Sequence, residues 1–371
     1  MRVAIVNLTR GGLSGGYVKY LRRMVPRLAR HPDVEELDVF VPEPVRQRLR
    51  GESWQIRSWS AEDIRRGFRG LKQTVQERRP DVVFIPTASW LHFGATPVVV
   101  MVRNMEPLEV PFGGNPLREA VKNLGRRRMA RRACRQATRV IAVSRHVGEF
   151  LTRRWHVAPD KIGVVYHGVD VPTSAPPPVR PAQLDDPVPP LMFAAGSIRP
   201  ARGLVDVIDA LAQLRKAGSP LIALVAGGVD TGMKAHVRRL AARAGSVGVA
   251  DRIIWAGQLT EAEMRWCYEF STAFVMTSRA EACPNVALEA MSHGCACVSV
   301  DRPPMPEFFG PAALYYQAGD ANGLTRAVMS LMSRPNTQME LKAAAFARAR
   351  TFDWQATAER TVAELRTAVR S

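Results

Sequence analysis

The chain has few of the features that mark a membrane or secreted protein. None of its apolar stretches approaches the roughly 20 residues that a membrane-spanning helix needs. The strongest apolar run, residues 97–102, is typical of a buried strand instead. The apolar run in residues 1–8 is too short for a signal peptide and lacks a small-residue cleavage site. We therefore expect a cytoplasmic protein.

Cysteine is scarce, and no pair of cysteines has the Cys-x-x-Cys spacing. There are five, at positions 134, 267, 283, 295 and 297. An odd number without paired spacing argues against a disulfide framework and against a zinc site. We interpret them as buried structural thiols. No other cluster resembles a metal site, so no metal is expected.

Acidic residues are fewer than basic ones, and the excess of basic residues lies mainly in the first half of the chain. The formal net charge is +18. Residues 1–170 hold 31 Lys and Arg against 16 Asp and Glu, whereas residues 171–371 hold 21 against 18. This asymmetry suggests that the first half meets something anionic. A basic nucleic-acid-binding protein is one alternative, but no recognition motif and no interleaving of aromatic with basic residues supports it.

Apolar strand-like runs alternate with helix-like stretches along the whole chain, which predicts parallel sheets of βα units. The expected strands are 2–8, 37–41, 81–87, 97–102, 139–143 and 162–166, and then 191–195, 221–226, 253–256, 273–277, 296–300 and 313–316. A proline-dense segment separates these two sets of expected strands and indicates a linker between two domains. The sequence thus predicts an α/β protein with two doubly wound domains facing a cleft, whose ligands lie at the carboxyl ends of the strands.

The most informative segment begins at Glu281 and follows the expected strand 273–277. Pro284 suits a first helical position because its missing N–H would have no partner there. The amides of Asn285 and Val286 would then point out of the helix end, ready for an anion such as phosphate. Glu289 would lie one turn further on. A phosphate site flanked by two carboxylates that accept from sugar hydroxyls suggests a nucleotide-sugar site, although two solvated acids at a helix start are the plainer alternative.

These residues resemble the Glu-x7-Glu signature of retaining GT-B glycosyltransferases, in particular glycosyltransferase family 4. The resemblance implies the GT-B fold, two Rossmann-like domains facing a cleft. It implies a first, acceptor-binding domain at 1–170, a linker at 171–190, a donor domain at 191–352, and a terminal helix at 353–371 that crosses back to the first domain. By the same resemblance Glu281 is catalytic and Glu289 holds the ribose of the donor.

A second match lies after the strand 191–195. Residues 196–203 are similar to the family pattern Gly-Arg-x-x-x-x-Lys-Gly, whose two basic residues bind the donor diphosphate. Arg202 falls on the Lys position, keeps the charge and adds bidentate hydrogen bonding, so the resemblance makes it catalytic. Ser197 falls on the Arg position, which departs from the family. Arg199, two residues on, is the candidate for the missing cation, with a solvated loop arginine as the alternative.

Two further loops resemble donor-binding loops of the family. The glycine-rich stretch 10–16, which includes Gly12, lacks dinucleotide and P-loop spacing, yet its glycines let a backbone approach a ligand closely. In the family this loop faces the donor diphosphate and the acceptor. Gln258 and Leu259 occupy the loop whose backbone grips the nucleobase in the family, and they precede a helix that we expect Thr260 to cap.

On the acceptor side the chain departs from its relatives. Many have a histidine beside the reacting sugar where Arg103 and Asn104 stand. Asn104 can donate and accept hydrogen bonds to a sugar but cannot act as a general base. No Asp-x-Asp is present to hold a donor through a divalent ion. We therefore expect a nucleoside-diphosphate sugar as donor substrate and no cofactor.

The resemblance implies transfer of a hexose, with retention, to a hydroxyl of a glycan or lipid-linked acceptor. A nucleotide-sugar epimerase or a phosphorylase on the same scaffold is the alternative, although neither accounts as well for the Glu-x7-Glu segment.

One helix-like segment, residues 117–138, concentrates the positive charge of the first half. Six arginines lie in it without one acid among them: Arg126, Arg127, Arg128, Arg131, Arg132 and Arg135. A solvated helix face is the commoner explanation. The sharper hypothesis is that this face binds anionic lipid headgroups and brings the enzyme to the inner face of the membrane, as it does in several members of the family.

Overall fold

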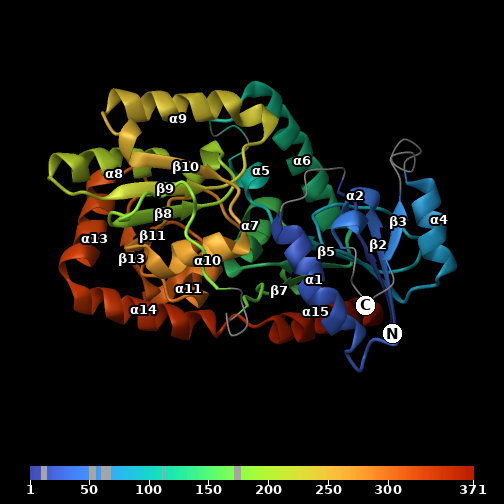
Figure 1. Ribbon diagram of the computed structural model, residues 1–371. Coiled ribbons are helices and arrows are strands. Elements are labelled where there is room, and N and C mark those ends of the chain that lie inside the picture. The colour runs from blue at the N-terminus through green and yellow to red at the C-terminus, as the bar shows by residue number, and fades with distance from the viewer. Residues whose placement is uncertain (10–14, 50–55, 60–67, 111, 113, 171–176) are drawn as a thin grey trace. The chain divides into compact units, whose positions relative to one another are not determined.

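The computed structural model describes residues 1–9, 15–49, 56–59, 68–110, 112, 114–170 and 177–371. The chain folds into two compact units (Figure 1). The first consists of Met1–Met105, Leu124–Gly168 and Asp353–Ser371, and the second of Glu106–Asn123 and Val169–Phe352. Residues 106–123 thus pack with the second unit, whereas the sequence placed them in the first domain.

The described strands of the first unit form one parallel sheet of order β3-β2-β1-β4-β5-β6-β7. Their bounds are β1 Arg2–Val6, β2 Glu36–Pro42, β3 Ile56–Trp59, β4 Val82–Ile85, β5 Val98–Val102, β6 Arg139–Ala142 and β7 Ile162–Val164. Every residue of β4 and β5 is buried, as expected for central strands covered on both faces. The edge strand β3 escaped prediction because its polar Arg57 and Ser58 interrupt the apolar pattern.

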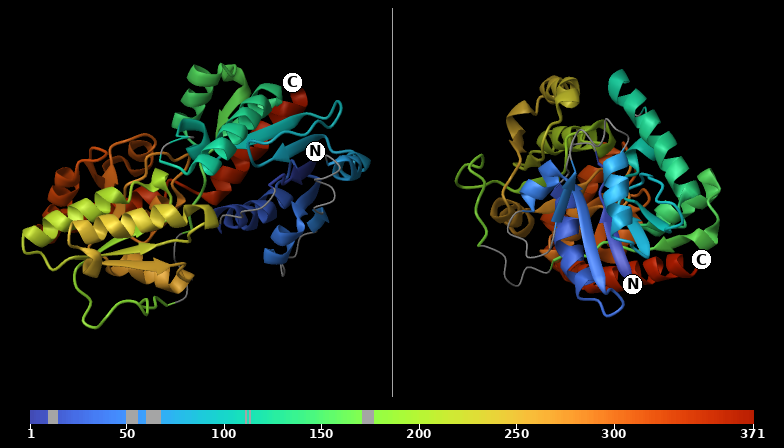
Figure 2. Two further views of the ribbon diagram at one scale, coloured as in Figure 1. Left: turned by 90° about the horizontal axis from the view of Figure 1, so that it is seen from above. Right: turned by 90° about the vertical axis from the view of Figure 1, so that its right-hand side faces the viewer.

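Helices surround this sheet. They are α1 Gly15–Ala29, α2 Glu43–Arg48, α4 Arg69–Glu77, α6 Leu117–Gln136, α7 Arg145–Trp155, the 3₁₀ turn η1 Pro159–Lys161 and α15 Trp354–Arg370. The first residues of α6, up to Asn123, belong to the second unit. Helix α15 packs on β4, β5, β6 and α1, so the terminal helix lies along the first sheet (Figure 2). Its start is capped by Asp353, which accepts from the Ala356 amide at 2.9 Å.

The second unit has a parallel sheet of order β10-β9-β8-β11-β12-β13 among its described residues. The bounds are β8 Leu191–Ala195, β9 Ile222–Ala226, β10 Ile253–Gly257, β11 Ala273–Met276, β12 Cys297–Val300 and β13 Ala313–Tyr316. Each lies within one residue of its predicted range at either end, because buried parallel strands are near-continuous apolar runs. The strand order reverses between β8 and β11, which is where doubly wound sheets bind ligands.

The helices of this unit connect the strands in βα order. They are α5 Glu106–Glu109, α8 Val205–Lys216, α9 Lys234–Ser246, α10 Glu261–Phe270, α11 Asn285–Ser292, α12 Met305–Phe309, α13 Ala321–Ser333 and α14 Pro335–Ala349, with 3₁₀ turns η2 Pro200–Arg202, η3 Thr231–Met233, η4 Ala250–Arg252 and η5 Gly310–Ala312. Thr260 caps α10 in a capping box with Glu263, as predicted. Residues 177–190 of the predicted linker contain no helix or strand, and residues 171–176 lie outside the described part.

Candidate active site

The candidate site lies at the carboxyl ends of β8 and β11, where the strand order of the second sheet reverses. After β8 the chain enters the 3₁₀ turn η2. The turn ends at Gly203, whose φ of +63° is in the left-handed region that favours glycine. A Cβ on Gly203 would also collide with the Thr277 carbonyl oxygen. Glycine is therefore required here for the turn to approach the end of β11.

Two hydrogen bonds and an ion pair hold these two loops together. The Thr277 hydroxyl donates to the Arg202 carbonyl at 2.5 Å, and the Arg279 amide donates to the Ala201 carbonyl at 2.6 Å. The Arg279 side chain donates to buried Asp206 at 2.7 Å. Because backbone and side chains both connect the loops, the position of Arg202 is set relative to the loop that carries Glu281.

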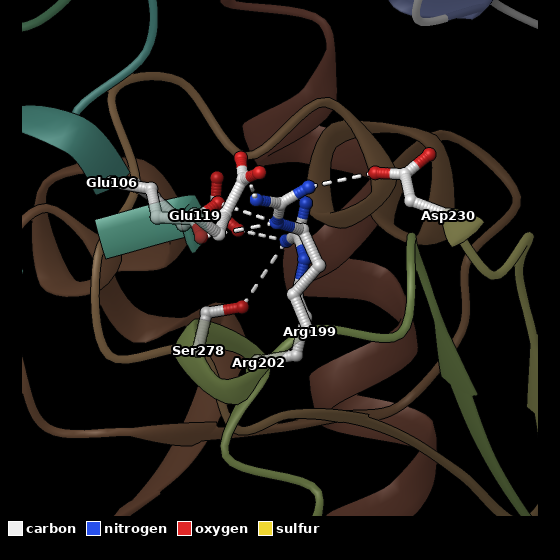
Figure 3. Close-up of polar contacts among 7 residues, drawn as sticks. Glu106, Glu119, Arg199, Arg202, Asp230 and Ser278 are labelled. Carbon is white, nitrogen blue, oxygen red and sulfur yellow. Dashed lines mark hydrogen bonds and ion pairs between the residues drawn. The ribbon is translucent and has the colours of Figure 1, made fainter. Parts of the chain in front are cut away.

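Arg202 and Glu281 form an ion pair in the site through the Arg202 nitrogen Nη1. The same nitrogen donates to the Ser278 hydroxyl at 3.2 Å (Figure 3). The Glu281 side chain is 12% exposed, and its burial raises the pKa of the carboxyl in spite of the opposing charge of Arg202. A half-buried cation beside a buried carboxylate is an arrangement that can stabilise charges of both signs during a reaction.

Arg199 is engaged by three carboxylates. Its Nε lies 2.9 Å from Glu106, its Nη2 3.2 Å from Glu119 and its Nη1 2.7 Å from Asp230. Burial acts to lower the pKa of Arg199, but these carboxylates outweigh it and the pKa is raised. A donor-binding role for Arg199 stays a prediction, and it would have to compete with three ion pairs.

The start of α11 corrects one expectation about the phosphate site. The first helical residue is Asn285 and not Pro284, which has φ −78° and ψ 80° and forms an inverse γ-turn. The Asn285 amide consequently donates to the Cys283 carbonyl at 3.0 Å, so an anion would have to compete with this hydrogen bond, and the donor-binding role of Asn285 stays a prediction. The Val286 amide makes no hydrogen bond with the described residues, so it remains the candidate anion donor at this helix end.

Glu289 is supported by two aromatic side chains. The buried Tyr268 hydroxyl donates to Glu289 Oε2 at 3.3 Å. The ring of His293 stacks on the ring of Tyr268 with 5.4 Å between centroids. Burial lowers the pKa of His293, which favours the neutral imidazole. The Tyr268 hydroxyl therefore orients the Glu289 carboxylate.

The loops after β8, β9 and β10 are joined at this edge of the sheet. The Gly227 amide donates to the Gly257 carbonyl at 2.6 Å, and the Ile198 amide donates to the Gly228 carbonyl at 3.1 Å. A Cβ on Gly228 would lie 2.9 Å from the side-chain nitrogen Nε2 of Gln258. The predicted donor residues Ser197, Gln258 and Leu259 therefore lie on neighbouring loops, with Ser197 and Gln258 exposed to solvent.

Two family descriptions match nearly the whole chain. "Glycosyl transferases group 1" matches residues 179–348, and "Glycosyltransferase Family 4" matches residues 14–172. The chain belongs to the family 4, group 1 glycosyltransferases.

Solved structures agree with this assignment. The glycosyltransferase resembles Alr3699/HepE of Anabaena, crystallised with UDP-glucose, with a TM-score of 0.77 and 17% identity over 99% of this chain and 100% of that one. Sucrose-phosphate synthase of Thermosynechococcus elongatus gives a TM-score of 0.73 at 17% identity over 99% and 98%. At these identities the likeness establishes the fold, and the predicted GT-B fold class is confirmed.

Curated relatives cover part of the glycosyltransferase. D-inositol 3-phosphate glycosyltransferase of Segniliparus rotundus is 25% identical over 241 residues, 63% of this chain and 53% of that protein. The protein of that name from Frankia alni is 28% identical over 233 residues, 60% of this chain and 57% of that protein. The chain thus spans little more than half the length of these relatives.

The predicted acceptor-side residues Arg103 and Asn104 lie in the first unit of the glycosyltransferase. Arg103, which follows β5, places its guanidinium carbon 4.7 Å from the ring centroid of Tyr17 and 5.3 Å from that of Tyr20. Asn104 is exposed. Gly12 lies outside the described residues. The acceptor-side roles of Arg103 and Asn104 stay predictions.

The arginines predicted for a surface lie on α6, and all but the half-buried Arg127 are exposed. Exposed Leu117, Val121 and Met129 add an apolar component to the same helix. Among the described residues, no helix is long and apolar enough to span a membrane. Within the same part of the chain, no group of His, Cys, Asp and Glu has the arrangement of a metal site.

Several residues that build the site of the glycosyltransferase were not singled out from the sequence. Ser278 directly follows the predicted strand, so its place was a usable signal. Asp206 and Tyr268 had no such signal in the sequence. Asp206 accepts from the Tyr316 hydroxyl, 110 positions away, at 2.9 Å, and Tyr268 meets Glu289 across 21 positions. Such pairings arise only when the sheet brings distant segments together.

Proposed function

We propose that the glycosyltransferase transfers a hexose from a nucleoside-diphosphate sugar to an acceptor hydroxyl with retention of the anomeric configuration. The observation that carries the proposal is the contact of Arg202 with Glu281 at the reversal of strand order in the second sheet. This position is where doubly wound sheets hold nucleotides. A cation for a diphosphate and a carboxylate for sugar hydroxyls are thereby within reach of one ligand.

The roles follow from the charges that develop during transfer. Arg202, assisted by the Val286 amide, neutralises the departing diphosphate through preorganised electrostatics. Glu281 holds sugar hydroxyls and stabilises the positive charge that develops on the sugar ring. The leaving phosphate accepts the proton of the acceptor hydroxyl, so that attack and departure occur on the same face. Glu289, oriented by Tyr268, accepts hydrogen bonds from the ribose hydroxyls.

The substrate classes are narrowed by the relatives. Alr3699/HepE was crystallised with UDP and with UDP-glucose, so uridine diphosphate sugars are the first donors to test. The acceptor is a glycan or a lipid-linked hydroxyl compound, and D-inositol 3-phosphate, named in the curated relatives, belongs in the same panel. No cofactor is required. The enzyme acts in the cytoplasm, without nucleic acid as a partner.

The α6 arginines bring the enzyme to a lipid-linked acceptor. Five of the six predicted arginines are exposed, and three exposed apolar side chains lie on the same helix. Each arginine near an anionic surface contributes about 1 kcal/mol, so the cluster suffices for reversible attachment. We therefore place the protein as a peripheral enzyme at the inner face of the membrane.

A thermal-shift panel of nucleoside diphosphates and their sugars tests the donor. Ligands that bind the native state raise stability by mass action, by about 2.7 kcal/mol at a hundredfold excess over Kd. We expect one base to raise Tm by several degrees, equally with and without EDTA. An NMR assay with donor and acceptors then follows the anomeric configuration of the product. A panel without any shift would overturn the proposal, and conversion of the donor without an acceptor would indicate an epimerase.

A further inference from the structure

Arg199 connects the turn η2 to the segment of described residues 106–110, 112 and 114–123, here called the 106–123 segment. Glu106 opens α5 and Glu119 lies in the first turn of α6, and both accept from Arg199. Asp230, which precedes η3, accepts from the third guanidinium nitrogen at 2.7 Å. One side chain thus connects the start of η2 to the starts of α5, α6 and η3 (Figure 3).

Arginine is the only side chain that can make this set of contacts. Each of its three nitrogens donates to a different carboxylate. The planar guanidinium presents its donors in a rigid fork, whereas a lysine offers one compact ammonium. The side chains of Arg199, Glu106 and Glu119 are 16%, 13% and 13% exposed, so these two ion pairs are screened less than surface pairs, whereas Asp230 is exposed.

A second contact attaches the same segment to the same turn. Gly114 has φ +74° and approaches Pro200 so closely that a Cβ would lie 3.3 Å from the Pro200 Cβ. The Gly114 carbonyl accepts from Arg239 Nη2, on α9, at 3.2 Å. The 106–123 segment is therefore fixed to η2 at two separate points.

The segment lies next to the reacting groups. Arg199 is the residue before the 3₁₀ turn η2, and Arg202 is the last residue of that turn. Arg199 pairs with Glu106, and Arg202 pairs with Glu281. Figure 3 shows Glu106 and Glu119 on one side of the two arginines. The negative charge of Glu106 also contributes to the raised pKa of Glu281.

The charge around Arg199 decides what can bind there. Three carboxylates contact Arg199, and Lys122 lies 3.6 Å from one of them, Glu119. Among these five groups the net charge is −1, which disfavours a diphosphate. A neutral hydroxyl meets no such repulsion and can donate to a carboxylate oxygen. The surroundings of Arg199 thus suit a sugar hydroxyl better than a phosphate.

We propose that Arg199 is a positioning residue that holds the 106–123 segment, and with it Glu106, beside the Arg202–Glu281 pair so that the acceptor hydroxyl is oriented for transfer. It does not serve as the second cation for the diphosphate. The inference rests on the proposed function for its acceptor, whereas the attachment of the segment is measurable without any substrate.

The test compares Arg199→Met and Arg199→Lys with wild type by hydrogen exchange, nucleotide thermal shift and transfer kinetics. Exchange in peptides that cover residues 106–110 and 114–123 should accelerate about fivefold or more in Arg199→Met, because fewer contacts oppose local opening. The rise in Tm that UDP causes should be the same in Arg199→Met as in wild type. The acceptor kcat/KM should fall by about ten- to a hundredfold, since small displacements of a positioned group have effects of that size. In Arg199→Lys, both the exchange rate of these peptides and the acceptor kcat/KM should return only part of the way to their wild-type values.

Two further variants complete the design. Glu119→Gln should accelerate exchange in the same peptides, because it removes one partner of Arg199. Arg243→Met is the matched control, since it breaks the Arg243–Asp209 pair of the same unit, 2.8 Å long, and should change neither exchange in the segment nor transfer. If Arg199→Met does not fold, Arg199→Lys and Glu119→Gln carry the test.

The outcomes separate this inference from the proposed function. Loss of the UDP shift in Arg199→Met with unchanged exchange in the segment would make Arg199 a diphosphate ligand and overturn the inference. Unchanged exchange together with unchanged acceptor kcat/KM would overturn it as well. If wild type itself shows no nucleotide shift, the proposed function fails, while faster exchange in the variants would still support the attachment by Arg199.

Discussion

Two groups of arginines in this molecule are used in opposite ways. Arg199 and Arg202 are partly buried, Arg199 pairs with three carboxylates and Arg202 with one, so their guanidinium groups have defined positions. The α6 arginines from Arg126 to Arg135 lie in residues 120–148, a stretch that contains no Asp or Glu, and most are exposed. The first arrangement suits chemistry at one point, because paired charges have fixed geometry. The second produces a diffuse positive field that salt screens within about 10 Å.

The largest effect is expected from the paired group. Glu281→Ala and Arg202→Ala should each lower transfer turnover by about two orders of magnitude or more, because both residues act on the transition state. Circular dichroism and Tm should change little, and Arg243→Met should retain full turnover. Wild-type turnover by either purified alanine variant would remove the distinction between the site arginines and the surface arginines.

The exposed arginines of α6 should contribute to salt-dependent membrane binding and not to catalysis. Changing Arg126, Arg127 and Arg128 to Gln should weaken binding to anionic vesicles about tenfold or more, at about 1 kcal/mol per arginine, and leave turnover on a soluble acceptor unchanged. Sedimentation with vesicles at low and high salt measures this. A control with Arg215, Lys216 and Arg243 changed to Gln removes the same charge from the second unit. Equal losses in both triple variants, or equal binding to neutral vesicles, would leave α6 as a solvated helix face.

The smallest effect concerns His293, which stacks on Tyr268 behind Glu289. Its folded-state pKa lies below the ordinary value, so the folded protein binds the proton less readily than the unfolded chain does. Its contribution to stability is therefore complete above about pH 6.5 and is lost as pH falls through the folded-state pKa. His293→Phe keeps the stacked ring but cannot titrate. The Tm loss between pH 7 and pH 5 should be smaller in this variant by about 1–3 °C. An unchanged or larger loss would contradict this sign.

Much of the fold was predictable for a local physical reason. Central parallel strands such as β5 and β8 are buried on both faces, so they appear in the sequence as apolar runs bounded by loops. The strand β3 was missed because an edge strand needs no such run. The motif residues Arg202 and Glu281 were found because each lies in a short contiguous pattern next to a predicted strand. Their contact was not visible in the sequence, since 79 positions separate them.

The amide of Asn285 shows where local reasoning failed. The sequence correctly indicated a helix end near Pro284, but the backbone angles of that proline decide which amides remain without partners. With φ −78° and ψ 80°, Pro284 directs the Asn285 amide to the Cys283 carbonyl. A shift of one residue in the helix start thus gave the Asn285 amide a partner within the protein, with which a phosphate would have to compete.

By itself, the sequence determined the α/β fold class, the order of the predicted strands, the family, and the positions of Glu281, Arg202 and Glu289, because periodicity and contiguous motifs are local properties. Only the tertiary structure decided that Arg199 faces three carboxylates and that residues 106–123 pack with the second unit. Glu106 and Arg199 are 93 positions apart, and nothing in either neighbourhood specifies the other. Their pairing exists because the folded second unit brings α5 and η2 together, and burial then favours pairing of the charges.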